Sequence, residues 1–209
     1  MIVVIEGISA AGKTTWCRRH AADRCVPEAG PITGAPDREA DPLAAARFWA
    51  AANARRWQAA LALERASGCA VCDTDPLKLH YVWTLWRIGA ATEAQWRAEC
   101  AAAREQIAAR RLGFADRYHV RAIDADQARR QRDNDPARTR RHFELHLRLQ
   151  APLIAWYETL ACVLPGRVQF DWPDSGEFET GSAAAPDPLR YALDRFDALV
   201  GALPAGAVG

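Results

Sequence analysis

Apolar and polar positions along the chain alternate between short strand-like runs and longer helical segments. An apolar run rich in β-branched residues at 2–6 leads into a glycine-rich turn and then into a segment suited to a helix. Strands that alternate with helices predict a parallel sheet covered by helices on both faces. We therefore expect an α/β fold with a five-stranded parallel sheet, whose strands lie at 2–6, 24–28, 69–72, 118–123 and 167–172.

Capping residues, prolines and glycines mark the boundaries of the helices. Asp41 precedes Pro42, and the Ala-rich segment after it has no breaker before Gly68, which predicts one long helix over 43–66. By the same reasoning Asp75, which precedes a proline, opens the next helix. Further helices are expected at 75–87, 92–111, 124–132, 139–164 and 187–203.

Length and composition narrow the class of protein. At 209 residues, 50% of them apolar, the chain suits one domain spanning 1–209. A formal net charge of +1 gives no general reason to expect a nucleic-acid polymer or a membrane as partner. Apolar segments are short and the N-terminus runs directly into a motif, so we expect a soluble, cytoplasmic protein. The scattered cysteines, including the Cys69 and Cys72 pair, are expected to be reduced and structural. A homodimer is possible.

A phosphate-binding motif follows the first strand. Gly7, Gly12, Lys13 and Thr14 fit GxxxxGK[ST] between a strand and a helix, the context that this motif requires. Backbone N–H groups of such a loop surround phosphate oxygens, the lysine reaches the β- and γ-phosphates, and the threonine hydroxyl binds Mg²⁺. The motif alone does not choose between a kinase, a GTPase, a motor and a regulatory ATPase. The expected nucleotide-binding residues are Gly7, Ser9, Ala10, Ala11, Gly12, Lys13, Thr14 and Thr15.

The order of further motifs resembles the nucleoside and nucleotide kinase branch of P-loop proteins, especially the deoxynucleoside kinase and thymidylate kinase group. The resemblance covers nearly the whole chain, although only the first of its motifs is specific by itself. It implies a three-layer P-loop fold, ATP and Mg²⁺ as cofactors, and transfer of the γ-phosphoryl group to a hydroxyl or phosphate of a small-molecule acceptor. The motifs are EGISAAGKTT at 6–15, CVPEAG at 25–30, AVCDTDPLK at 70–78, an Arg-rich segment at 129–141 and VQFDWP at 168–173.

Two acidic residues are candidates for the acceptor side. The resemblance implies that Glu28, after the second strand, acts as base toward the acceptor hydroxyl, and the alternative is a solvated loop glutamate. Asp73 ends the third strand at the sheet edge where such folds bind ligands, so it could hold Mg²⁺ or orient the acceptor. Which of the two is the base stays open. For Asp75 we favour helix capping over metal or substrate binding.

An Arg-rich segment at about 126–142 is interpreted as a lid. Its arginines could close over the triphosphate and stabilise the transferring phosphoryl group, and we assign that catalytic role to Arg132 and Arg138, which flank the DNDP break. The alternative is a solvated helix face paired with nearby aspartates, which we expect for most of these side chains. The arginines are Arg129, Arg130, Arg132, Arg138, Arg140 and Arg141.

Aromatic side chains and sequence departures bear on the acceptor. The residues expected near the acceptor pocket are Phe48, Trp49, Tyr81, Trp83 and Trp86, each of which is more often a core residue. Thr74 follows the third-strand acid where deoxynucleoside kinases usually carry an arginine, and this DTD also resembles nicotinamide riboside kinase domains. A phosphotransferase of a non-nucleoside metabolite or antibiotic therefore remains an alternative. A regulatory ATPase is another, against which we find no clear hhhhD strand of the ATPase type and no guanine-reading NKxD motif.

Overall fold

The computed structural model describes residues 1–30, 32–133, 143–178 and 187–206. The described chain contains a five-stranded, all-parallel sheet, as the sequence predicts. The strands lie in the order β2-β3-β1-β4-β5. The strands are β1 (Ile2–Glu6), β2 (Cys25–Val26), β3 (Ala70–Asp73), β4 (Arg117–Val120) and β5 (Val168–Gln169).

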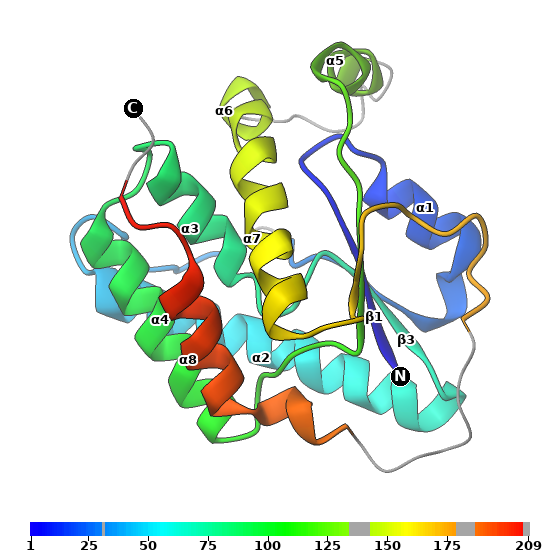
Figure 1. The fold of residues 1–209 in the computed structure, drawn as a ribbon, viewed down its shortest axis with the longest axis horizontal. Helices are drawn as coiled ribbons and strands as arrows, with labels where there is room; N and C mark the ends of the chain where they lie inside the picture. Colours follow the sequence, from blue (N-terminus) through cyan, green and yellow to red (C-terminus); the bar gives the residue numbers. More distant parts are fainter. Residues whose placement is uncertain (31, 134–142, 179–186, 207–209) are drawn as a thin grey trace.

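Helices lie on both sides of the sheet, which is compatible with a three-layer fold. Helix α1 lies on one side of the central strands, whereas α7 and α8 lie on the other (Figure 1). None of the described helices is long and apolar enough to cross a membrane. The helices are α1 (Lys13–His20), η1 (Ala22–Arg24), α2 (Pro42–Ser67), α3 (Leu79–Arg87), α4 (Glu93–Ala108), α5 (Ala125–Asp133), α6 (Phe143–Arg148), α7 (Gln150–Val163), η2 (Pro188–Tyr191) and α8 (Leu193–Ala202).

The hydrophobic core surrounds the central strand. All five residues of β1 are buried, as expected for a strand between two neighbours with helices on both faces. Trp57 of α2 and Trp156 of α7 are also buried and pack into the same core, beside Tyr118 of β4. Cys69 and Cys72 are buried free thiols, which confirms their structural interpretation. This core fixes the carboxyl ends of the strands, where the candidate site lies.

Two helices that we predict as continuous are interrupted. The segment predicted at 139–164 contains two helices, α6 and α7, within its described part. Pro152 lies in the first turn of α7, and a proline ring clashes with the carbonyl one turn earlier, so the helix restarts there. The segment at 187–203 divides into η2 and α8. Phe114 N–H donates a hydrogen bond of 2.8 Å to the carbonyl of Arg190, and in a continuous helix that carbonyl would accept a bond from within the helix.

The expected helix at 75–87 also begins later, at Leu79. Asp75 caps a turn instead of the helix itself, because its Oδ1 accepts from Leu77 N–H at 2.9 Å. Lys78 then adopts a left-handed conformation, with φ of 48°, and serves as the N-terminal flank of α3. Residues 74–78 therefore form a tight loop at the end of β3.

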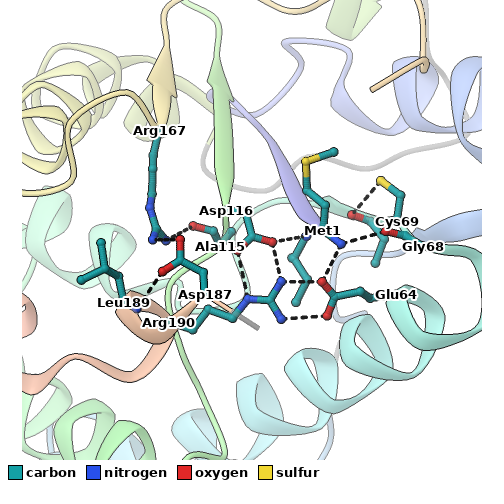
Figure 2. A network of polar contacts seen from close by, with 12 residues as sticks. Met1, Glu64, Gly68, Cys69, Ala115, Asp116, Arg167, Asp187, Leu189 and Arg190 are labelled. Carbon is teal, nitrogen blue, oxygen red and sulfur yellow. Dashed lines mark hydrogen bonds and ion pairs between the residues drawn. The ribbon is translucent and has the colours of Figure 1, made fainter. Parts of the chain in front are cut away.

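A buried ionic network lies at the amino ends of the strands, opposite the carboxyl ends (Figure 2). Arg190 of η2 is 3% exposed and forms bidentate contacts with Glu64 of α2 and with Asp116 before β4. The Met1 ammonium lies 2.5 Å from Glu64, and Ile2 N–H donates to Asp116 at 2.6 Å. These contacts tie the C-terminal part of the chain to α2 and β1, far from the carboxyl ends of the strands.

Candidate active site

The glycine-rich loop formed by residues 7–12 connects β1 to α1. Ala10 and Gly12 adopt left-handed conformations with φ of 68° and 96°, so the loop curls back before the helix begins. Helix α1 has no side-chain cap at its N-terminus, which leaves its first N–H groups available to an anion. Lys13 Nζ crosses the loop and donates to the carbonyls of Gly7 and Ile8 at 2.7 and 3.2 Å.

Thr14 and Asp73 meet beneath this loop. Thr14 Oγ1 donates to Asp73 Oδ2 at 2.6 Å, which joins the first turn of α1 to the end of β3. Burial raises the pKa of Asp73, whereas the Thr14 bond and the Lys13 charge lower it. Its other oxygen, Oδ1, is buried without a hydrogen-bond partner among the described residues. Hydroxyl and carboxylate oxygens suit Mg²⁺, although no group of three or more acidic, His or Cys ligands occurs in the described chain.

A second layer of buried polar residues supports the loop from behind. Glu6, at the end of β1, is 1% exposed; its Oε1 accepts from Gly7 N–H at 2.9 Å and its Oε2 from Asp75 N–H at 3.0 Å. His80 Nε2 lies 3.5 Å from the same carboxylate, and burial lowers the pKa of His80 to about 4. Burial also raises the pKa of Asp75 to about 7. The cluster fixes the loop and the end of β3 relative to each other.

Arg56 clamps the ends of two strands. It comes from α2, is 7% exposed, and donates to the carbonyl of Pro27 at 3.0 Å and to those of Asp73 and Thr74 at 2.7 and 2.8 Å. Thr74 has φ of 72°, a conformation that β-branched residues rarely adopt. The planar guanidinium reaches several carbonyls at once and holds this strained backbone next to Glu28.

A cavity of about 610 Å³ opens beside the glycine-rich loop. Its wall combines loop residues, the loop after β2, and side chains of α2, α3, α4 and α7. Trp49 and Tyr81 line it as the sequence predicts, whereas Trp83 is buried in the core and Trp86 stacks on Trp96. The polar lining residues are Glu6, Ser9, Lys13, Glu28, Arg38, Asn53, Thr74, Lys78, His80, Thr84, Glu99 and His146.

Glu28 lines this cavity in contact with the second lysine of the chain. Lys78 Nζ donates to Glu28 Oε1 at 2.6 Å, and both side chains are partly exposed to the cavity. Burial would raise the pKa of Glu28, but the charges of Lys78 and Lys13 outweigh it and lower the pKa to about 2. Glu28 is therefore a permanently charged acceptor of hydrogen bonds. Asp73 lies outside the cavity wall.

The remaining predicted residues are placed as follows. Gly7, Ser9 and Lys13 line the cavity, Ala11 is buried, and Thr15 is exposed. Among the expected lid residues, Arg132 contacts Asp133 at 2.8 Å and Glu144 at 3.6 Å. These ion pairs match the alternative of a helix face with acidic partners. Arg138 lies outside the described residues, and so does most of the segment that we interpret as a lid.

A smaller cavity of about 180 Å³ lies between α1 and the segments that follow β4 and β5. Trp172 packs against this loop, its Nε1–H donates to Glu6 O at 2.9 Å, and the Arg121 guanidinium lies 5.4 Å from the Trp172 ring centroid. The rest of the wall is formed by Trp16, His20, Asp171, Pro173 and Asp174. The two planar groups offer a surface on which a flat ring could stack.

Several residues of the site escape sequence reasoning. Arg56 is one of many arginines in an Ala-rich helix, and Glu6 reads as the last residue of an apolar strand. Lys78 carried a signal, because lysine occurs only at positions 13 and 78 and both side chains line the cavity. A scan against protein-family models finds no match to this chain, and a search of curated proteins finds no sequence that matches it significantly.

Proposed function

We propose that this protein is an ATP-dependent phosphotransferase that transfers the γ-phosphoryl group to a small-molecule acceptor, foremost a nucleoside or nucleotide. One observation carries the proposal: the GxxxxGK[ST] sequence lies between a parallel strand and a helix, and Lys13 shares a cavity with the carboxylate Glu28. The arrangement suits a donor site and an acceptor site that meet at one lysine.

The donor side is assigned to the glycine-rich loop. The uncapped N-terminus of α1 and the Lys13 ammonium fit a polyphosphate, and the Thr14–Asp73 pair fits the oxygens around Mg²⁺. When bound, Mg·ATP supplies the phosphoryl group and neutralises charge that develops on its oxygens. Lys13 exchanges its carbonyl partners for phosphate oxygens. The surface of Arg121 and Trp172 suits the planar base of the nucleotide.

The acceptor side is assigned to the larger cavity. Glu28 faces it and Asp73 does not, so we assign the contact with the acceptor hydroxyl to Glu28. A carboxylate whose pKa is about 2 is a weak base, but it accepts a strong hydrogen bond and orients the hydroxyl. Phosphoryl transfer through a loose transition state demands little early proton removal, so orientation is the larger contribution. Lys78 holds Glu28 in place.

The test is a transfer assay with matched variants. The protein is incubated with Mg·ATP and a panel of nucleosides, nucleoside monophosphates and hydroxylated metabolites, while ADP release and product mass are followed. Lys13→Ala should abolish the mass gain of one phosphoryl group, whereas Arg18→Ala, which removes an exposed charge from the same helix, should leave it intact. Nucleotide binding without transfer to any acceptor would refute the kinase and favour a regulatory ATPase. Transfer only to a non-nucleoside would redefine the substrate.

A further inference from the structure

The charged residues that line the larger cavity balance one another. Its basic side chains are Lys13, Lys78 and Arg38, and its carboxylates are Glu6, Glu28 and Glu99. Lys78 contacts Glu28 at 2.6 Å, and Arg38 Nη2 lies 3.5 Å from Glu99 Oε1. Lys78 and Arg38, the basic groups other than Lys13, therefore each already have an acidic partner.

The Arg38–Glu99 pair is built into the wall of the cavity. The guanidinium of Arg38 lies 5.3 Å from the Trp49 ring centroid, and Gln95 of α4 donates to the Arg38 carbonyl at 3.1 Å. The Glu99 side chain is only 12% exposed. Asn53, one turn of α2 beyond Trp49, adds an amide that lines the same cavity. This part of the wall offers donors and acceptors of hydrogen bonds but little unbalanced charge.

Tyr81 connects the two ionic pairs. Burial raises the pKa of its phenol, and the charges of Arg38 and Glu28 act on it in opposite directions. The Lys78 ammonium lies 5.9 Å from the Tyr81 ring centroid. The wall of the one cavity includes Ser9 of the glycine-rich loop, Glu28, Tyr81 and the Arg38–Glu99 pair.

We infer that the acceptor is an uncharged hydroxyl compound, with its reactive hydroxyl at Glu28 and a polar neutral group near Asn53 and Arg38–Glu99. This inference rests on the proposed function, in which Lys13 serves the donor phosphates. With Lys13 committed to the donor, the two remaining basic groups of the described wall, Lys78 and Arg38, each already contact a carboxylate. A phosphorylated acceptor would bring up to two further negative charges to this wall, and neither basic group is left unpaired to compensate them.

The experiment compares acceptors in pairs. Each nucleoside or hydroxylated metabolite is assayed beside its own monophosphate with Mg·ATP, and the binding of both compounds is measured by calorimetry in the presence of Mg·ADP. We expect the uncharged member to be preferred by about 100-fold or more in kcat/KM, a ratio that electrostatic exclusion can supply. Monophosphates that bind more tightly or react faster than their uncharged partners would overturn the inference while leaving the kinase intact. If the protein binds and phosphorylates no compound of either kind, the proposed function and the inference both fail.

A substitution that removes one carboxylate provides a gain-of-function test. Glu99→Gln keeps the size of the side chain but leaves Arg38 without its acidic partner, so the preference should shift toward monophosphates by about 10-fold. Glu105→Gln is the matched control, because Glu105 lies on the same helix, is exposed, and contacts Arg47 at 4.0 Å outside the cavity. An identical acceptor preference in both variants would remove the Arg38–Glu99 pair from the argument and overturn the placement of the neutral group.

Discussion

Replacement of Arg56 by methionine tests the link between the buried clamp and the candidate site. The variant fills a similar volume but donates no hydrogen bonds to Pro27, Asp73 and Thr74, whose carbonyls receive bonds of 2.7–3.0 Å in the wild type. At about 1 kcal/mol net for each bond, the free energy of unfolding should fall by about 3 kcal/mol. A protein of this size has about 5–15 kcal/mol in total, so the variant should still fold.

The clamp also predicts a functional loss in the folded variant. Without Arg56, the hydrogen bonds that hold Thr74 at its unfavourable φ of 72° are lost, and the loop that carries Glu28 loses its hydrogen bond at Pro27. Misplacement of Glu28 by about 1 Å can cost about 100-fold in turnover. Arg56→Lys should be intermediate, because one ammonium keeps the charge but cannot span several carbonyls.

Urea unfolding followed by tryptophan fluorescence measures the first effect, and the transfer assay measures the second. Arg55→Met is the matched control, because Arg55 is the exposed neighbour on α2 and its loss should change stability by less than about 0.5 kcal/mol. Equal stability of the Arg55 and Arg56 variants would refute the reasoning, since the buried bonds would then contribute nothing. A destabilised Arg56 variant with unchanged turnover would refute only the positioning role.

Three further substitutions test other contacts. Lys78→Met removes the main cause that lowers the Glu28 pKa, so burial should raise it and the acid limb of the pH–rate profile should move up by roughly one unit or more. Burial raises the pKa of Asp75 to about 7, so the folded state binds a proton more tightly than the unfolded state, and the free energy of unfolding should fall as pH rises through 7. Asp75→Asn should remove this fall in stability, as measured by urea unfolding at pH 5 and pH 8. Arg190→Met leaves Glu64 with only the Met1 ammonium as cationic partner and Asp116 with the Ile2 N–H, and it should lower the free energy of unfolding by about 3–5 kcal/mol, without changing nucleotide affinity measured by calorimetry.

The fold was predictable where local signals are strong. The run at 2–6 is continuous and apolar because β1 is buried on both faces, and Asp41 and Gly68 mark the ends of α2 through their own conformations. The interruptions of the two helices were harder to predict from the sequence. One break depends on a proline after the apparent start, and the other depends on a bond from Phe114, which lies 76 residues from Arg190 in the sequence.

The same distinction applies to the candidate site. The glycine-rich loop is a local motif, so its residues could be identified without tertiary information. The Glu28–Lys78 pair joins residues separated by 50 positions, and the bond from Arg56 to Thr74 spans 18. Such contacts depend on which strands neighbour each other, and a single sequence contains little information on that order.

Three buried carboxylates near the glycine-rich loop dominate the electrostatics of the site. Glu6, Asp73 and Asp75 are buried close in space to the glycine-rich loop, which suits a polyanion. Burying a charge without a partner is costly. Each has a compensating contact: backbone N–H groups for Glu6 and Asp75, and the Thr14 hydroxyl for Asp73. Among the described residues, Asp73 Oδ1 has no such partner. If the proposed function is correct, a cation that arrives with the nucleotide would complement this acidic cluster, and the nucleotide should bind more tightly with Mg²⁺ than without it.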